Sequence, residues 1–234
     1  MLKARLLGQR ELAPEVHHFD FEVPDVEALP FSPGQFVSVV KEIDGKEITR
    51  AYSIASPHDG NRFALCLNRV QDGMLSPHLF SLQPGDTVDI QEPLGYFTLR
   101  HPGHRIVFVA TGTGIAPFRS MLLHHLPSTQ PEVTLLFGAR YPYGLLYADE
   151  FLALTQQYPT FQFLPTVTRP DPQWQGRTGR VMAHLDEALA LRTPDELSTT
   201  DVYICGLREM VDDVRKELKA RGFDRKQIIY EKYD

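Results

Sequence analysis

The character of the sequence changes near residue 101, and this change constrains the fold more than any other feature of the chain. Before that point, short strand-like segments alternate with turns, for example at residues 35–40, 62–70 and 87–90. Regular short strands with frequent chain reversals are typical of antiparallel barrels. Pairs that favour reversal separate these segments at Pro33-Gly34, Asp44-Gly45, Asp59-Gly60, Asp72-Gly73 and Pro84-Gly85.

After residue 101 the chain alternates between strand-like and helix-like segments. The apolar run at residues 106–110 is typical of a buried strand, and a glycine loop and a helix at 117–125 follow it. Further strands are expected at 133–137, 161–167, 201–205 and 227–230, with helices at 149–157, at 181–190 and before Gly222. This alternation predicts a parallel sheet. We therefore expect two domains, an antiparallel β-barrel at residues 1–101 and an α/β parallel-sheet domain at residues 102–234.

Length and composition narrow the possible functions. The 234 residues are enough for two domains of about 100–130 residues each. The formal net charge of −6 argues against general nucleic-acid binding, which needs a concentrated basic surface. No apolar run reaches the roughly 18–20 residues that span a bilayer, and the first residues lack signal-peptide features, so we expect a cytoplasmic protein that does not enter membranes.

The cysteines and the N-terminal charges give two weaker indications. Cys66 and Cys205 are the only cysteines, and about four thiolates are needed for an iron–sulfur cluster. We expect no metal site in this chain, and any such cluster belongs to another protein. Lys3, Arg5 and Arg10 form a small basic group, which is either a solvated edge or a contact for an acidic partner.

The segment RAYS at residues 50–53 is suited to a flavin. Arg50 offers a fork of donors for phosphate, and Tyr52 offers an aromatic face for a flat heterocycle. The hydroxyl of Ser53 is able to hydrogen-bond a ring nitrogen.

The segment GTGIAP at residues 112–117 is suited to a dinucleotide. Gly112 and Gly114 follow a buried strand and precede a helix with Pro117 in its first turn, where backbone amides and the helix dipole favour a pyrophosphate. Pro117 replaces the third glycine of the usual pattern, so the loop taken alone is better read as an ordinary βα turn.

Three arginines favour NADP(H) over NAD(H). Arg140, Arg169 and Arg180 lie at or near the carboxyl ends of successive predicted strands, where they are able to converge on a 2′-phosphate. Taken singly, each arginine is more simply read as a surface charge.

Taken together, these motifs resemble the ferredoxin–NADP(H) reductase superfamily, particularly its short bacterial members. The resemblance covers essentially the whole chain and rests on the order of the motifs. They are RAYS at 50–53, DGMLSPHL at 72–79, EPLGYF at 92–97, GTGIAP at 112–117, LLYADEF at 145–151, YICG at 203–206 and YEKY at 230–233.

The resemblance implies a flavin-binding barrel followed by a nucleotide-binding domain, with the nicotinamide brought against the flavin where the domains meet. Arg50 then contacts the flavin phosphates, Tyr52 lines the isoalloxazine and Ser53 bonds the N5 region. The residues implied for FAD are Arg50, Ala51, Tyr52, Ser53, Leu67, Asn68, Gly73, Met74, Leu75 and Ser76.

The resemblance also assigns the second cofactor and the residues at the reacting rings. Thr113 then lies beside both cofactors, and the residues implied for NADP(H), with NAD(H) as the other possibility, are Gly112, Thr113, Gly114, Ile115, Pro117, Arg140, Thr168, Arg169, Arg180, Cys205 and Gly206. Tyr233 covers the flavin, although Asp234 extends beyond the usual final aromatic residue. Ser53, Cys205 and Glu231 are implied as catalytic. Without the resemblance, Cys205 reads as a small buried hydrophobic residue, as Cys66 does.

The expected reaction is hydride transfer between NAD(P)H and the flavin, followed by single-electron exchange with ferredoxin or flavodoxin. The direction of electron flow and the oligomeric state are left open. One alternative is an NADH-dependent flavin reductase or oxygenase reductase component, because the spacing of Trp174 and Gly176 also occurs in such relatives. Another is a non-catalytic flavin-binding electron-transfer subunit, and a third is an α/β protein with coincidental glycine loops.

Overall fold

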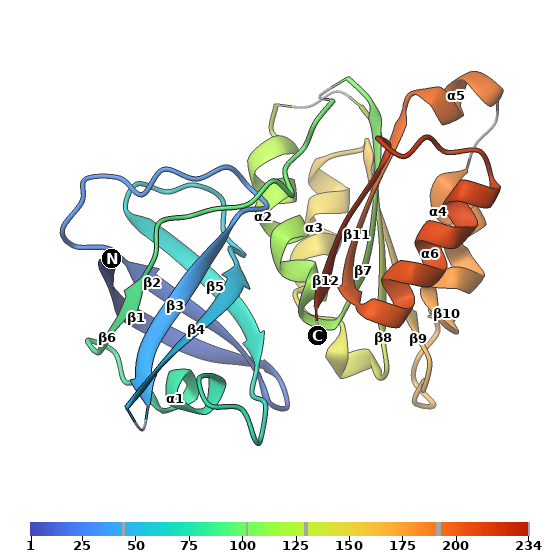
Figure 1. The fold of residues 1–234 in the computed structure, drawn as a ribbon. Helices are drawn as coiled ribbons and strands as arrows, with labels where there is room; N and C mark the ends of the chain where they lie inside the picture. The colour runs from blue at the N-terminus through green and yellow to red at the C-terminus, as the bar shows by residue number, and fades with distance from the viewer. Residues whose placement is uncertain (44, 102, 129–130, 191–192, 234) are drawn as a thin grey trace. The chain divides into compact units, whose positions relative to one another are not determined.

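The computed structural model describes residues 1–43, 45–101, 103–128, 131–190 and 193–233. The chain divides into two compact units (Figure 1). The first unit contains Met1–Leu99 and Ala116–His124, and the second contains Arg100–Ile115 and His125–Asp234.

The first unit is a six-stranded antiparallel sheet with the order β4-β3-β6-β1-β2-β5. Just after β4, Ile54 forms a bridge with Leu65 of β5, and the Ala55 amide donates to the Ala64 carbonyl at 2.8 Å. This contact joins the two outer strands, so the sheet closes into the predicted barrel. Its elements are β1 (Leu2–Ala13), β2 (Val16–Glu22), β3 (Phe36–Ile43), β4 (Lys46–Ser53), β5 (Arg62–Asn68), α1 (Ser76–Ser81) and β6 (Thr87–Ile90).

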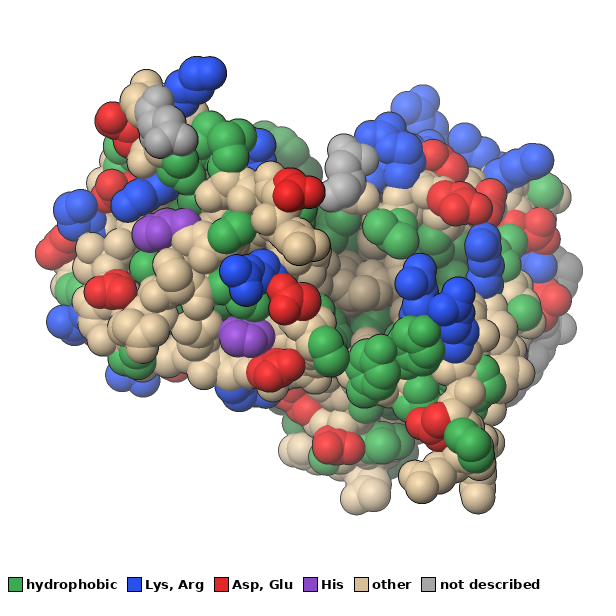
Figure 2. Space-filling model, turned by 90° about the horizontal axis from the view of Figure 1, so that it is seen from below, with side chains coloured by type: hydrophobic (Ala, Val, Ile, Leu, Met, Phe, Trp, Pro, Cys, Tyr) green, Lys and Arg blue, Asp and Glu red, His purple; other side chains and the backbone are tan. Residues whose placement is uncertain are grey.

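Alternating side chains explain why these segments form a barrel. Along β1, Ala4 and Leu6 point into the core while Lys3 and Arg5 point outward. Lys3 pairs with Asp89 at 3.0 Å, and Arg5 pairs with Glu22. Acidic and basic side chains lie close together at many points of the face drawn in Figure 2. Lys3 and Arg5 of the predicted basic group are therefore engaged within the barrel.

The second unit is a six-stranded parallel sheet with the order β10-β9-β8-β7-β11-β12. The helix α3 covers one face of this sheet, and α4 and α6 cover the other (Figure 1). The parallel α/β arrangement confirms the predicted fold class. The strands are β7 (Arg105–Thr111), β8 (Val133–Ala139), β9 (Phe161–Val167), β10 (Arg177–Thr178), β11 (Thr200–Leu207) and β12 (Ile228–Tyr233). The α-helices are α2 (Ile115–His125), α3 (Ala148–Gln157), α4 (Leu185–Leu189), α5 (Pro194–Ser198) and α6 (Arg208–Ala220), and the 3₁₀ helices are η1 (Gly112–Gly114), η2 (Pro142–Gly144) and η3 (Val181–His184).

The helix predicted at 181–190 is in fact two short helices, η3 and α4. The Ala183 amide bonds the Arg180 carbonyl three residues back, at 3.0 Å, which is the tighter spacing of a 3₁₀ turn. The His184 ring nitrogen Nε2 donates to the Thr178 carbonyl at 2.9 Å. These local bonds hold the first turn in the tighter form.

Helix α6 confirms the predicted amphipathic helix. Val211, Val214 and Leu218 are fully buried on its inner face. Gly222 has a φ of +92°, and the Phe223 amide then bonds the Leu218 carbonyl at 3.1 Å. A left-handed glycine just after the last turn ends the helix.

Helix α2 follows the glycine loop of the second unit, yet its residues 116–124 group with the barrel. Arg119 Nη1 donates to the Ala55 carbonyl at 2.7 Å, and the Ser120 hydroxyl donates to the Ser56 carbonyl at 2.6 Å. The predicted division cuts the chain once, after residue 101, whereas the two units of the structure are defined by contacts between residues. The two divisions therefore assign α2, Arg100 and His101 differently.

No helix within the described residues is long and apolar enough to cross a membrane.

Candidate functional site

The predicted flavin motif lies at the end of β4. Arg50 is exposed, and its Nη1 donates to the Thr49 carbonyl at 2.8 Å. Tyr52 is half-buried against the barrel core, and burial raises its pKa to about 12 despite the opposing effect of the Arg50 charge. Ser53 is buried and Ala51 is exposed. The segment therefore presents a cation and a neutral aromatic ring.

The second predicted flavin segment is a tight loop between β5 and α1. The Gly73 amide donates to the Val70 carbonyl at 2.9 Å, and the Val70 amide donates to the Ser76 hydroxyl oxygen at 3.0 Å. A Cβ on Gly73 would lie 2.9 Å from Val70 Cβ and 3.0 Å from Val70 O, so a larger residue strains this loop. The Ser76 oxygen accepts within the loop, and its hydroxyl keeps a proton to donate.

The other predicted flavin residues flank this loop. Leu67 is buried and Asn68 is exposed at the end of β5. Within the loop, Met74 is exposed while Leu75 is buried in the barrel core. Leu67 and Leu75 thus belong to the same hydrophobic core, and the role of these residues toward a flavin stays a prediction.

The glycine loop and the Cys205-Gly206 pair lie against each other in the second unit. A Cβ on Gly114 would lie 2.4 Å from the Cys205 carbonyl oxygen. A Cβ on Gly206, whose φ is +145°, would lie 2.3 Å from Thr111 Oγ1. Only hydrogen fits at either position, because the carboxyl ends of β7 and β11 approach so closely.

The same edge of the sheet has room for a ligand. Gly112 has a φ of +56°, and a Cβ there would have no heavy atom within 4 Å. Thr111 Oγ1 is buried without a hydrogen-bond partner among the described residues. Thr113 is half-buried, whereas Ile115 and Pro117 are buried at the start of α2. An unpaired buried hydroxyl beside an open glycine is a feature of a binding site.

The predicted catalytic residues of the second unit are neighbours across two strands. Cys205 pairs in register with Glu231, and Leu207 pairs with Tyr233. Burial raises the pKa of the Cys205 thiol well above its usual value, and the Glu231 charge raises it further. Hydrogen bonds involving Tyr233 and the Gly206 backbone act in the opposite direction. The thiol is therefore a neutral group at physiological pH.

Tyr233 is held at the end of β12 by its pairing with β11. Its predicted stacking on a flavin stays a prediction. Asp234, the additional residue beyond it, lies outside the described residues.

Two of the three predicted arginines lie on adjacent loops. The Arg169 amide donates to the Arg140 carbonyl at 2.7 Å, and the Thr168 amide donates to the Ala139 carbonyl at 3.1 Å. These bonds place the loops after β8 and β9 together. Arg180 is engaged elsewhere, because its Nη1 lies 3.2 Å from Glu209 Oε1 at the start of α6.

A pair of tyrosines that the sequence analysis did not single out accompanies these arginines. Arg169 Nη1 donates to the Tyr141 hydroxyl at 3.1 Å. The rings of Tyr141 and Tyr143 are stacked with centroids 5.2 Å apart, and Tyr143 is 60% exposed. The available signal was the segment YPY directly after a predicted strand. A stacked pair with one exposed ring offers a flat surface to a heterocycle.

Comparison with known proteins extends this geometry. Residues 3–99 match the oxidoreductase FAD-binding domain, and residues 108–216 match the oxidoreductase NAD-binding domain. The fold and these matches define the chain as an FAD- and NAD(P)-dependent oxidoreductase.

Individual relatives identify the family. The chain is 41% identical over 240 aligned positions to ferredoxin–NADP reductase B of Sorangium cellulosum, covering 99% of this chain and 97% of that protein. It is 28% identical over 236 positions to the toluate 1,2-dioxygenase electron transfer component of Pseudomonas putida, covering 99% of this chain and 67% of that protein. The structure of a ferredoxin NADP⁺ reductase from Neisseria gonorrhoeae with bound FAD and NADP is similar, with a TM-score of 0.85, 27% identity and coverage of 98% and 97%. The chain belongs to the ferredoxin–NADP reductase family.

Proposed function

We propose that this protein exchanges a hydride between NADP(H) and FAD, and single electrons between FAD and a ferredoxin or flavodoxin. The observation that carries the proposal is the pairing of the glycine loop with Cys205-Gly206 in a chain whose barrel presents Arg50, Tyr52 and Ser53. When bound, FAD supplies the conversion between two-electron hydride transfer and one-electron transfer. Residues 1–101 hold FAD in this proposal, and residues 102–234 hold NADP(H).

The barrel residues bind and orient the flavin. Arg50 neutralises phosphate charge through an exposed guanidinium, and the loop at 73–76 supplies backbone amides and the Ser76 hydroxyl to the pyrophosphate. Tyr52 packs its uncharged ring against the isoalloxazine. Ser53 donates a hydrogen bond to the N5 region, and backbone groups of residues 67–68 face the ring.

The second unit binds the nucleotide along the carboxyl ends of its strands. The segment at 112–117 receives the pyrophosphate. Gly112 leaves space for it, and the backbone amides of the segment donate hydrogen bonds to it. Cys205, whose side chain is fully buried, contributes a small neutral group next to the nicotinamide, and Gly206 allows close approach. Glu231, which pairs with Cys205 across β11 and β12, supplies a negative charge next to that thiol, and Tyr233 lies at the end of β12.

Arg140 and Arg169 recognise the 2′-phosphate that distinguishes NADP(H). Their loops are joined by the hydrogen bond between the Arg169 amide and the Arg140 carbonyl, so both cations serve one anion. Arg180 first has to leave Glu209, with which it forms an exposed ion pair. Thr168 adds an exposed hydroxyl on the same loop as Arg169.

The specificity for NADPH is tested with Arg169→Ala. Loss of charge-assisted hydrogen bonds of about 1.5–3 kcal/mol lowers kcat/KM for NADPH by about 10- to 100-fold. The value for NADH stays within about twofold, because that nucleotide lacks the phosphate. Arg225→Ala, which changes an exposed arginine after α6, is the matched control and leaves both values unchanged. Equal losses for both nucleotides would contradict the assignment.

The electron partner is tested separately with a purified [2Fe–2S] ferredoxin and a purified flavodoxin. Anaerobic addition of NADPH bleaches the flavin band of the purified protein, and the reduced protein then reduces either carrier. Bleaching without reduction of either carrier contradicts the partner assignment while leaving the flavin assignment intact.

The second candidate is an NADH-dependent reductase component of an oxygenase. It is favoured by the relative from Pseudomonas putida and by the Trp174 loop, in which Gly176 packs so closely that a Cβ there would lie 2.4 Å from the indole. A kcat/KM for NADH above that for NADPH selects this candidate.

A further inference from the structure

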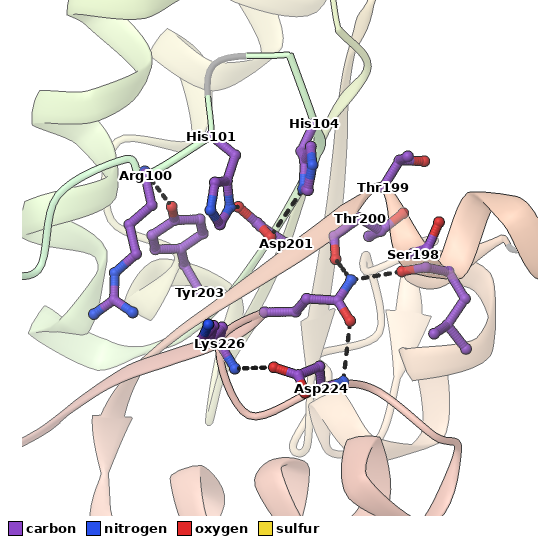
Figure 3. A network of polar contacts seen from close by, with 12 residues as sticks. Arg100, His101, His104, Ser198, Thr199, Thr200, Asp201, Tyr203, Asp224 and Lys226 are labelled. Carbon is purple, nitrogen blue, oxygen red and sulfur yellow. Dashed lines mark hydrogen bonds and ion pairs between the residues drawn. The ribbon is translucent and has the colours of Figure 1, made fainter.

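A buried carboxylate and two histidines meet at the start of β11 (Figure 3). His101 Nδ1 lies 2.7 Å from Asp201 Oδ2, and His104 Nδ1 lies 3.1 Å from Asp201 Oδ1. The two imidazoles flank the carboxylate with ring centroids 4.6 Å apart. One ligand atom from each residue lies within 4.8 Å of the others.

We propose that His101, His104 and Asp201 form a binding site for a divalent transition metal, with Zn²⁺ as the best match. Imidazole nitrogen and carboxylate oxygen are the ligands that Zn²⁺ accepts besides thiolate. Ligand atoms in a tetrahedral zinc site are about 3.3 Å apart, as follows from bonds of about 2.0–2.1 Å. The two nitrogen–oxygen separations of 2.7 and 3.1 Å lie close to this value, and the three ligand atoms lie within 4.8 Å of one another.

The exposure of the three side chains is that of a metal site with an open position. The Asp201 side chain is 1% exposed, while those of His101 and His104 are 43% and 29% exposed. The carboxylate thus forms the floor, and the histidines form the solvent-facing rim. A water molecule completes the coordination from the rim side.

Backbone hydrogen bonds hold the described residues that carry or flank the three ligands. The His104 amide donates to the His101 carbonyl at 3.0 Å. Immediately before them, the Arg100 amide donates to the buried Tyr203 hydroxyl at 2.9 Å. Asp201 lies within β11, in register with Ile106 of β7. Because the ligands are already held, little conformational entropy is lost on binding.

Charge also favours a cation at this position. A buried carboxylate is costly unless a positive or hydrogen-bonded partner compensates it, and the imidazole N–H groups now fulfil that role. On metal binding, each Nδ1 gives its proton to solvent or, by tautomerisation, to its own Nε2. The metal charge then compensates Asp201 directly.

The site is separate from the proposed nucleotide site. Asp201 and Cys205 are four positions apart on β11, which corresponds to about 13 Å along the strand. The metal therefore stabilises His101 and His104 against β11 and takes no part in hydride transfer.

The test uses the purified FAD-bound protein after treatment with a chelator. Calorimetric titration with ZnCl₂ is expected to give one Zn²⁺ per chain and to raise Tm by about 5 °C or more at a free Zn²⁺ concentration a hundred times Kd. His101→Ala and His104→Ala each weaken binding by about tenfold or more. His58→Ala, which removes an exposed histidine of the barrel unit, leaves binding unchanged.

Copper provides a readout that does not depend on the stability of the variants. The Cu²⁺ form of the wild-type protein is expected to show nitrogen superhyperfine splitting from both imidazoles in its electron paramagnetic resonance spectrum. Wild-type Zn²⁺ binding that equals that of the double variant His101→Ala/His104→Ala overturns the proposal. A copper spectrum without nitrogen coupling also overturns it, and the cluster is then only a hydrogen-bonded support for Asp201.

Discussion

Replacement of Gly114 by alanine tests the close contact between the glycine loop and β11. The added Cβ would lie 2.4 Å from the Cys205 carbonyl oxygen, 2.6 Å from its carbonyl carbon and 2.8 Å from Gly206 Cα. All three atoms belong to the backbone of a central strand, so no flexible side chain is able to move aside. Overpacking of this kind costs about 1–3 kcal/mol, which corresponds to a fall in Tm of roughly 2–12 °C for a chain of this size.

Thermal unfolding of the FAD-bound Gly114→Ala protein measures this cost, and anaerobic NADPH titration measures its effect on the loop. We expect the lower Tm together with weaker NADPH binding. Gly103→Ala is the control, because a Cβ on Gly103 meets no heavy atom within 4 Å. A Gly114→Ala protein with a Tm within about 1 °C of wild type would show that the two strand ends are not in tight contact, and the reasoning would fail.

Three further predictions concern other residues. Tyr203→Phe removes the hydroxyl to which the Arg100 amide donates at 2.9 Å, and we expect it to lower the free energy of unfolding by about 1–3 kcal/mol. Urea denaturation measures this loss, and a loss below about 0.3 kcal/mol contradicts the prediction. Because burial and then the Glu231 charge raise the pKa of the Cys205 thiol, reactive thiolate is scarce at neutral pH and increases only as pH rises toward that pKa. Mass spectrometry after iodoacetamide treatment is therefore expected to find Cys205 unmodified in the native protein and alkylated after denaturation. Fast alkylation of Cys205 in the native protein refutes this expectation. Ser53→Ala slows flavin reduction by about tenfold in stopped-flow absorbance with FAD still bound, whereas an unchanged rate removes Ser53 from the reacting site.

The sequence predicted those helices and strands that are determined by residues within or next to the element itself. The strands at 87–90 and 161–167 have the predicted bounds, because their ends coincide with turn residues. The two-residue strand β10 (Arg177–Thr178) was not predicted, since its existence depends on pairing with β9 rather than on any periodicity. The grouping of residues 116–124 with the barrel likewise depends on contacts with carbonyls some 60 positions earlier in the chain.

The same distinction applies to the site. The motif residues were recognisable because their types and order are specific, and in the structure Gly114 packs against the backbone of Cys205 and Gly206. The neighbourhood of Arg140 and Arg169 depends on a backbone bond between two loops, which no pattern in either loop encodes. Asp201 was missed because its partners, His101 and His104, lie about 100 positions earlier.

The attachment of helix α2 has a consequence for how such proteins are cut and recombined. The helix is covalently part of the βα alternation, but Arg119 and Ser120 are hydrogen-bonded to carbonyls of Ala55 and Ser56. A gene fragment that stops at residue 99 therefore encodes a barrel without one of its own helices, and the complementary fragment carries that helix with its polar anchors unpaired. A chimera made by exchanging the first half for that of another reductase has to preserve the acceptor geometry just after β4, whatever else it changes.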